Sequence, residues 1–209
     1  MPRVLTEDEV SDFRERLCAA AERLFAERGL QGVGMRQLAA ELGVSPMTPY
    51  RYFKDKDDIL ATVRASGFDR FSDALEAAMA SSDHPVEQAA AVGDAYFRFA
   101  LDHSAAYKLM FDFNQPTEAN YPDLIRATDR AKRTMTAYIG RLVDAGVLEG
   151  DQNLIAHVFW ATIHGLVVLH LAGKLPGPID VETLRDESFR ALFFSYQRRG
   201  AETAPIAAG

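Results

Sequence analysis

Residues 34–56 read GMRQLAAELGVSPMTPYRYFKDK, and this stretch decides the fold. Apolar residues recur at helical spacing over about 35–42, which predicts a short helix. Gly43 then permits the left-handed backbone of a sharp turn between two helices. Ser45 can cap a second helix, and Pro46 suits its first position, where a missing N–H is not needed. The stretch therefore predicts a helix-turn-helix, two short helices joined by a tight turn.

The second helix of this unit should expose side chains that are short and polar, methyl-bearing, phenolic or basic, and it should bury Phe53. The exposed set is Met47, Thr48, Tyr50, Arg51 and Tyr52. Such side chains suit base edges, thymine methyl groups and phosphates in a major groove. A plainer alternative exists for each: Tyr50 as a core aromatic, and Met47 and Thr48 as residues at a helix end.

The charge of the chain is unevenly distributed. The 209 residues carry a net charge of −7, which by itself argues against a nucleic-acid partner. Within 34–56, however, four basic residues stand against two acidic ones. The sequence thus describes an acidic body with a locally basic segment, although charge runs are often only solvated faces. The single cysteine, Cys18, excludes a disulfide framework and a Cys-rich zinc module.

The segment resembles the tetracycline-repressor (TetR) family of bacterial transcription regulators over about residues 10–65. The resemblance rests on a set of motif positions: Leu38-Ala39, Gly43-Val44-Ser45, Tyr50, Tyr52-Phe53, Lys56, Ile59 and Leu60. It implies a homodimer, a variable helical ligand domain, and release of double-stranded operator DNA when a small-molecule effector binds.

The resemblance also implies roles for single residues. Arg36 would approach a phosphate at the start of the second helix, and Tyr50, Tyr52 and Lys56 would contact phosphates further along. The groove-facing residues would be Ser45, Met47 and Thr48, with Arg51 beside them in the DNA-binding set. For Arg36 and Lys56, an isolated solvated charge is the alternative.

Two positions depart from the family pattern. Pro49, as the fourth residue of the predicted recognition helix, removes a backbone hydrogen bond to the Ser45 carbonyl. Gly34 stands where Ser or Thr would cap the second helix, so this helix is expected to start less firmly.

The whole chain reads as all-α, with about nine helices. A capping box of Thr6 and Glu9 predicts the start of the first helix, and Gly29 its end. The remaining helices are expected at about 35–42, just after Ser45, 56–80, 86–102, 104–112, 122–145, 152–173 and 181–199. We expect a three-helix DNA-binding domain over 1–62, an effector-binding and dimerisation bundle over 63–209, and a frayed tail from Ala201.

Residues 154–173, LIAHVFWATIHGLVVLHLAG, are almost entirely apolar and long enough to span a bilayer. Three histidines and the lack of a basic anchor at the start argue against a membrane. A helix that is apolar all round is otherwise buried on every side, here against the core and a second subunit. The candidate dimer residues are Val168, Leu171, Phe189, Leu192, Phe193 and Tyr196.

The carboxyl-terminal half also resembles one TetR subgroup with a Trp…His-Gly signature, carried by Trp160, His164 and Gly165 and by the run from 96 to 111. Aromatic and methionine side chains are dense here, which favours an apolar effector pocket with a few polar anchors. Ordinary core packing is the alternative for each residue. The candidate pocket residues are Phe97, Leu101, Tyr107, Met110, Phe111, Met135, Tyr138, Phe159, Trp160, Ile163 and His164.

No catalytic, cofactor-binding or metal-binding motif is found in the sequence. His157 and His164 are seven residues apart, but no carboxylate or thiol on the same helix joins them. The first thirty residues hold no apolar signal segment, so a cytoplasmic location is expected. The sequence thus predicts a ligand-responsive regulator that binds DNA, most simply a repressor released by a largely apolar effector. The alternatives are a helical interaction protein, or a helical-bundle enzyme, with a non-functional helix-turn-helix.

Overall fold

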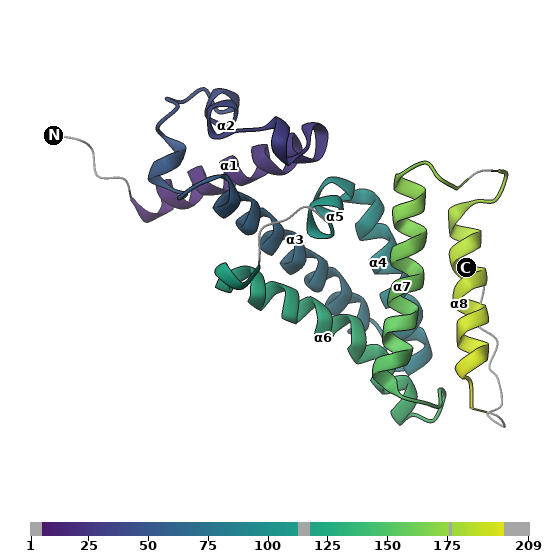
Figure 1. The fold of residues 1–209 in the computed structure, drawn as a ribbon. Coiled ribbons are helices and arrows are strands. Elements are labelled where there is room, and N and C mark those ends of the chain that lie inside the picture. The colour runs from purple at the N-terminus through teal and green to yellow at the C-terminus, as the bar shows by residue number, and fades with distance from the viewer. Residues whose placement is uncertain (1–5, 113–117, 176, 199–209) are drawn as a thin grey trace. The chain divides into compact units, whose positions relative to one another are not determined.

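The computed structural model describes residues 6–112, 118–175 and 177–198, and within these ranges the regular structure is entirely helical (Figure 1). Eight α-helices follow one another along the chain: α1 (Glu7–Arg28), α2 (Met35–Glu41), α3 (Lys56–Met79), α4 (Pro85–Asp102), α5 (Ser104–Met110), α6 (Pro122–Asp144), α7 (Gln152–Leu171) and α8 (Val181–Tyr196). The all-α prediction is confirmed. The expected tail from Ala201 lies outside the described residues.

Local signals set the ends of α1 as the sequence predicts. The Thr6 side chain accepts a hydrogen bond from the Glu9 N–H at 3.2 Å, and the Glu9 carboxylate accepts one from the Thr6 N–H at 3.0 Å. This capping box satisfies two donors that the helix itself cannot. At the other end Gly29 has φ 73°, the positive value that ends a helix, and its N–H bonds to the Phe25 carbonyl.

The predicted ninth helix is wrong. Where a short α-helix was expected after Ser45, the chain makes turns and a three-residue 3₁₀ helix, η2 (Pro49–Arg51). The Ser45 carbonyl accepts from the Thr48 N–H at 2.8 Å, three residues ahead instead of four. The reason is that Pro49 lacks the N–H that an α-helical turn would bond to the Ser45 carbonyl.

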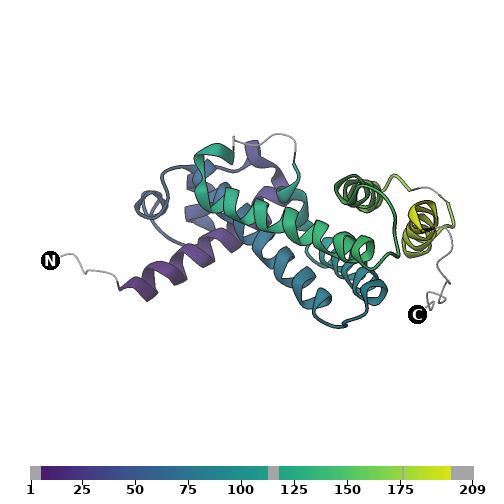
Figure 2. The same cartoon turned by 90° about the horizontal axis from the view of Figure 1, so that it is seen from below.

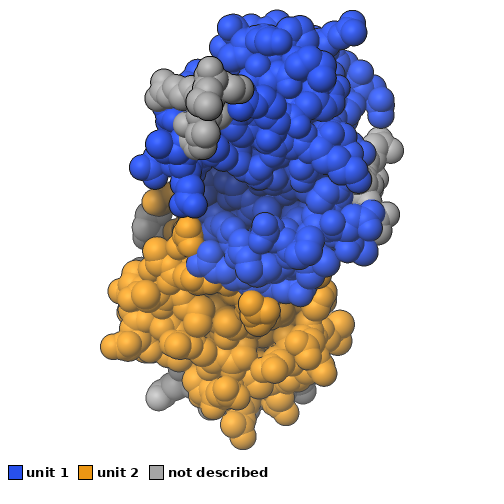
Figure 3. Space-filling view, turned by 90° about the vertical axis from the view of Figure 1, so that its left-hand side faces the viewer, with its two compact units in different colours: residues 1–72, 103–131 blue, residues 73–102, 132–209 orange. Residues whose placement is uncertain are grey.

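The chain forms two compact units (Figure 3). The first comprises residues 1–72 and 103–131, and the second comprises residues 73–102 and 132–209. Helices α3 and α6 contribute residues to both. These units describe packing, so the functional division predicted between residues 62 and 63 remains a prediction.

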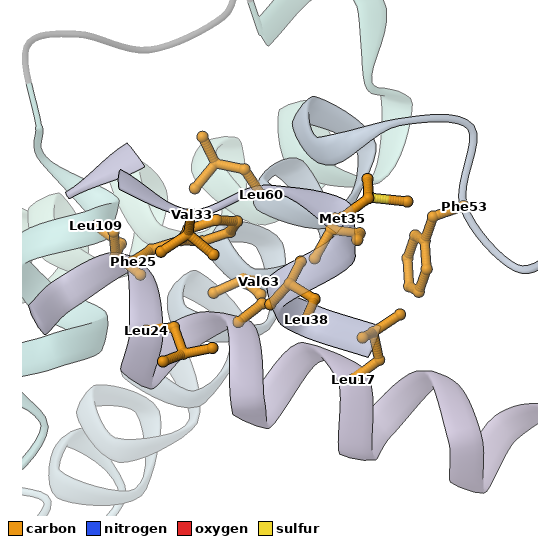
Figure 4. Close-up of a cluster of buried hydrophobic side chains, with 12 residues drawn as sticks. Leu17, Leu24, Phe25, Val33, Met35, Leu38, Phe53, Leu60, Val63 and Leu109 are labelled. Atoms are coloured by element: carbon orange, nitrogen blue, oxygen red, sulfur yellow. The ribbon is translucent and has the colours of Figure 1, made fainter. Parts of the chain in front are cut away.

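The core of the first unit holds the helix-turn-helix in place (Figure 4). Helix α1 supplies Leu17, Leu24 and Phe25, which are at most 1% exposed. Buried side chains from α2, α3 and α5 close around them: Met35, Leu38, Ile59, Leu60, Val63 and Leu109, with Val33 and Phe53 from the connecting segments. Each fully buried Leu or Phe stabilises the fold by about 1.5–3 kcal/mol.

The second unit is built around α6 and α7, with α8 beside α7 (Figures 1 and 2). Its core includes Ile139, Leu142, Ile155 and Phe159. No described residue of α8 is itself fully buried, so this helix is attached by one face. Its carboxyl end is tied down by two backbone hydrogen bonds, because the Tyr196 carbonyl accepts from the Glu149 N–H and the Arg198 N–H donates to Val147.

Among the described residues, α7 is the one helix that is long and apolar enough to cross a membrane. A third of its most apolar window, 33%, is buried inside the protein. A core helix of a soluble protein meets the same criteria, so this feature is weak support for a membrane span.

Candidate nucleic-acid interface

Helix α2 presents one face to the core and the other to solvent. Met35, Leu38 and Ala39 are buried, whereas Arg36 is exposed. Gly34 has no side chain to cap the helix, and the Gln37 side chain compensates in part by accepting a hydrogen bond from the Gly34 N–H at 2.7 Å. The start of α2 is thus held from within the helix, and its second residue, Arg36, is exposed to solvent.

The turn after α2 is fixed by backbone hydrogen bonds. Gly43 has φ 66°, and its N–H bonds to the Ala40 carbonyl at 3.1 Å. The Val44 N–H reaches further back, to the Ala39 carbonyl at 3.0 Å. This paired arrangement is the Schellman motif, which reverses the chain direction at a helix end. It confirms the left-handed backbone predicted at Gly43 and sets the direction of the next segment.

The segment after the turn has an anchored side and an exposed side. Pro49 and Phe53 are buried, and the Pro49 carbonyl accepts from the N–H groups of Tyr52 and Phe53 at 3.0 Å each. Met47 is 67% exposed and Tyr50 is 48% exposed. Both side chains expose apolar area to water. A contiguous group of exposed apolar side chains is typical of a binding surface.

The other predicted contact residues of this segment differ in exposure. Ser45 and Arg51 are exposed, whereas Thr48 is half-buried. The Ser45 hydroxyl caps the turn by accepting from the Met47 N–H at 3.4 Å, a long hydrogen bond. Ser45 thus has a local structural role beside its predicted contact with DNA.

Arg14 of α1 contacts the end of the segment that follows the turn and holds it in place, a role that was not predicted from the sequence. Its guanidinium lies 4.1 Å from the centre of the Phe53 ring and donates a hydrogen bond to the Tyr52 carbonyl. The Tyr52 ring packs on Phe13 with 4.3 Å between ring centres. Tyr52 was expected to be exposed and is half-buried, because its ring joins the edge of the core.

Lys56, the first residue of α3, was expected to face a phosphate. Its ammonium instead donates to the Leu30 carbonyl at 2.6 Å, which ties α3 to the short 3₁₀ helix η1 (Leu30–Gly32). An ammonium has three donors, so this contact alone does not use them all. Asp58 nearby accepts from the Lys54 N–H at 3.0 Å and helps close the turn before α3.

The second unit contains a cavity between its helices. The lining side chains are Leu75, Val92, Gly93, Tyr96, Met135, Tyr138, Trp160, Ile163 and Phe189, and they leave about 20 Å³ unfilled. A space of this size holds about one water molecule and is far smaller than the pockets that bind drug-sized molecules. Burial, with a smaller effect from Tyr96, raises the pKa of the Tyr138 phenol. Tyr138 therefore stays uncharged at any physiological pH.

Four of the predicted pocket residues line this cavity: Met135, Tyr138, Trp160 and Ile163. Others lie elsewhere in the second unit: Phe97, Leu101, Phe159 and His164, the last with a pKa lowered by burial. Three belong to the first unit: Tyr107, Met110 and Phe111. The pocket prediction left out the other five lining residues, since helical periodicity does not reveal which inward side chains border a gap. These are Leu75, Val92, Gly93, Tyr96 and Phe189, the last of which was assigned to the dimer interface.

The predicted dimer residues divide into two groups. Val168 and Leu171 on α7 are 44% and 41% exposed, respectively. The α8 residues are partly buried within their own chain: Phe189, Leu192, Phe193 and Tyr196. Phe189 contacts Phe159 with 5.6 Å between ring centres. Leu169 and Phe194, which were not predicted, are exposed apolar residues of the same two helices.

No group of three or more metal-ligating side chains is found among the described residues. His157 is exposed, and its Nδ1 lies 2.6 Å from the Asn153 carbonyl one turn earlier on α7. His157 thus forms a hydrogen bond within its own helix.

Comparisons with known proteins place this geometry in a family. A model of the tetR family of bacterial regulatory proteins matches residues 17–63, and a model of the tetracyclin repressor-like C-terminal domain matches residues 89–193. The chain belongs to the tetR family. Members of this family are ligand-responsive, DNA-binding transcriptional regulators, and so is this protein.

Individual relatives agree with the assignment to the tetR family. The chain is 33% identical to the transcriptional regulator BetI of Brucella canis, over 77% of this chain and 80% of BetI. It is 26% identical to the transcriptional activator FasR of Mycolicibacterium smegmatis, over 68% of this chain and 65% of FasR. A solved structure of a protein of unknown function from Rhodococcus sp. RHA1 matches with a TM-score of 0.79 and 28% identity, covering 95% of this chain and all of that one.

Proposed function

We propose that this TetR family regulator is a cytoplasmic, homodimeric repressor that a small, largely apolar effector releases from a near-palindromic operator. The observation that carries the DNA-binding part is the exposed edge of residues 45–51, which stands on a buried base. Met47 and Tyr50 face solvent while Pro49 and Phe53 are fixed in the core. A rigid support with an exposed, chemically mixed edge suits reading of a major groove.

Within this proposal the contacts divide into positioning and sequence choice. Arg36, Tyr50, Tyr52 and Lys56 set the register by contacting phosphates, which carry no sequence information. Met47 and Thr48 carry part of the base choice, with the apolar Met47 side chain suited to a thymine methyl group. Arg51 is exposed beside them. The half-buried ring of Tyr52 and the Leu30 contact of Lys56 make these two the weaker phosphate contacts.

For the dimer we propose a contact made by α7 and α8 with the same helices of a second copy. Exposed apolar side chains on these two helices support it: Leu154, Val168, Leu169, Leu171 and Phe194. Exposed apolar side chains of this size are costly to leave in water, and a two-fold axis would pair these helices with their own copies. Two recognition segments related by this axis would read two half-sites about one helical turn of DNA apart.

For release we propose that the effector enters the cavity of the second unit. Leu75 of α3 lines this cavity, and the first residue of the same helix is Lys56. A ligand that moves α3 would therefore change the spacing of the two recognition segments in the dimer. This requires two states with different affinity for the ligand, as any such coupling does.

The test is selection of bound fragments from sheared genomic DNA of the source organism, at low and at moderate salt. We expect a discrete near-palindromic site that survives the higher salt, because base contacts add to the salt-sensitive phosphate term. Diffuse, salt-labile binding alone would refute the proposal and favour a helical interaction protein. Catalytic turnover of a small molecule would instead favour the helical-bundle enzyme. Transcription from the recovered site then separates a repressor from an activator.

A further inference from the structure

The recognition segment, residues 45–53, makes turn-type backbone hydrogen bonds in place of a helical ladder. The N–H groups of Thr48 and Arg51 each bond to a carbonyl only three residues back. A bond that spans four residues, as in an α-helix, joins the Phe53 N–H to the Pro49 carbonyl at 3.0 Å. A 3₁₀ turn has poorer hydrogen-bond geometry than an α-helix, so it fixes its own backbone less firmly. The position of this segment therefore depends on contacts from elsewhere in the chain.

Two neighbouring residues of α1 hold the end of the recognition segment. The Phe13 ring packs on the Tyr52 ring with 4.3 Å between their centres and 30° between their planes. The Arg14 guanidinium lies 4.1 Å from the centre of the Phe53 ring, which is 2% exposed. Figure 4 shows this ring at one end of the buried cluster, beside Leu17 of the same helix α1. One ring contact and one cation–π contact thus fix the end of the segment against α1.

Arg14 adds a polar contact to the cation–π contact. Its Nη1 donates a hydrogen bond to the Tyr52 carbonyl, 38 residues further along the chain. A planar guanidinium donates hydrogen bonds within its plane while its face stacks on a ring. One half-buried side chain therefore holds both the backbone and an aromatic ring of the segment. A second arginine of α1, Arg16, is exposed and pairs with Asp12 of its own helix at 3.4 Å.

We propose that Arg14 is a positioning residue for sequence recognition, which contacts the recognition segment and not the DNA and sets the place of Met47 and Tyr50 in the major groove. Hydrogen bonds and close apolar contacts to base edges weaken when a side chain is misplaced by about 1 Å or less. Attraction to phosphates varies slowly with distance and is less sensitive. Loss of Arg14 should therefore lower the preference for the operator more than the affinity for DNA in general. This proposal rests on the proposed function, in which residues 45–51 read the groove.

The test compares binding of the full-length protein to its selected operator and to unrelated DNA of the same length, at several salt concentrations. Arg14→Met loses a charge-assisted hydrogen bond and a cation–π contact, so operator affinity should fall at least about tenfold. Affinity for unrelated DNA should fall less than about threefold. The slope of log operator affinity against log salt should change by less than about half a unit, because no phosphate contact is lost. Arg14→Lys keeps the charge and a donor and should recover part of the preference.

Arg16→Met is the matched control, because it removes the same charge from α1 two residues away. Its operator affinity should stay within about twofold of that of the parent protein. A fall in the salt slope of about one for each subunit in Arg14→Met would show a direct phosphate contact and overturn the proposal. An unchanged operator preference in Arg14→Met, or equal losses in the two variants, would overturn it as well.

Amide hydrogen exchange without DNA tests separately whether Arg14 holds the segment. The Tyr52 and Phe53 amides should exchange at least about tenfold faster in Arg14→Met than in the parent protein, while those of α2 stay within about threefold. Exchange as slow as in the parent protein would overturn the positioning role. If the methionine variant does not fold, Arg14→Lys replaces it, with smaller changes in the same direction. A parent protein without operator preference would instead refute the proposed function, and it is recognised before any variant is compared.

Discussion

Replacing Gly43 by alanine tests the turn on which the recognition segment depends. Gly43 has φ 66°, a left-handed backbone that residues with a side chain adopt only at a cost. No atom lies within 4 Å of the position that a Cβ would take. The expected effect is therefore backbone strain alone, without any steric clash.

The size of the effect follows from two opposing terms. The left-handed conformation costs alanine about 1–2 kcal/mol. Alanine also has fewer conformations in the unfolded chain, which returns about 0.4–1 kcal/mol. The free energy of unfolding should thus fall by about 1 kcal/mol, and the melting temperature by roughly 2–4 °C for a chain of this size.

Urea and thermal unfolding of the purified protein measure this change. Gly32→Ala is the matched control, because Gly32 lies outside the left-handed region and a Cβ there would stand at an ordinary 3.4 Å from Arg28 Cβ. Its free energy of unfolding should not fall. Gly43→Asn should lie between parent and alanine variant, since asparagine tolerates this backbone better. A Gly43→Ala variant as stable as the parent protein would refute the reasoning.

Three further predictions follow from single contacts. Tyr50→Phe removes the hydroxyl of an exposed side chain, so operator affinity measured by fluorescence anisotropy should fall about threefold to tenfold while thermal stability is unchanged. Equal affinity of the variant and the parent protein would show that this hydroxyl does not contact DNA. Glu118→Gln removes the charge that faces the Arg64 guanidinium, whose side chain is 6% exposed, and should lower the free energy of unfolding in urea by about 1–2 kcal/mol. The control Asp12→Asn, in an exposed ion pair, should change this free energy by less than about 0.5 kcal/mol. Similar losses in the two variants would count against a special role for Arg64. Burial raises the pKa of the Cys18 thiol from 9.0 to about 11, so at pH 8 the native protein should react with iodoacetamide about 100-fold more slowly than the urea-unfolded chain. The free energy of unfolding should also fall as pH rises from 9 toward 11, because the thiol of the unfolded chain loses its proton first. Equal alkylation rates would contradict this prediction.

The helices of this protein were predictable because their signals are local. The capping box at Thr6, the glycine at 29 and the Schellman turn at Gly43 each act within a few residues, and each is where the sequence placed it. The periodic apolar positions of α1 also identify its buried face, with Leu17, Leu24 and Phe25 in the core. Local propensity and packing favour the same structure here, and this agreement makes prediction of these helices from sequence dependable.

The recognition segment shows where local rules compete. Pro46 favours a helix start, but Pro49 three residues later removes a further donor, and the result is a 3₁₀ turn. Hydrogen bonds between residues far apart in the sequence could not be predicted either. Arg14 is 38 residues from the Tyr52 carbonyl that it binds, and Lys56 is 26 residues from Leu30. No periodicity encodes such pairs.

The cavity was predictable only in kind. Dense aromatic residues indicate a pocket or a core, and which gap remains open depends on the angles between helices. Gly93 is the clearest example, since its significance comes from the Phe189 ring that packs on it from α8. Helical spacing places both residues on apolar faces but does not bring those faces together.

The most direct test of the DNA-binding account is the salt dependence of binding to the selected operator, compared between parent protein, Arg36→Gln and Arg133→Gln. Both arginines are exposed, but Arg36 begins the helix-turn-helix and Arg133 lies on α6. Loss of one phosphate contact should reduce the slope of log affinity against log salt by about one. If Arg36 contacts a phosphate, Arg36→Gln alone shows this reduction in slope, by about one for each subunit. Equal slopes for all three proteins, or the reduction in Arg133→Gln instead, would contradict it.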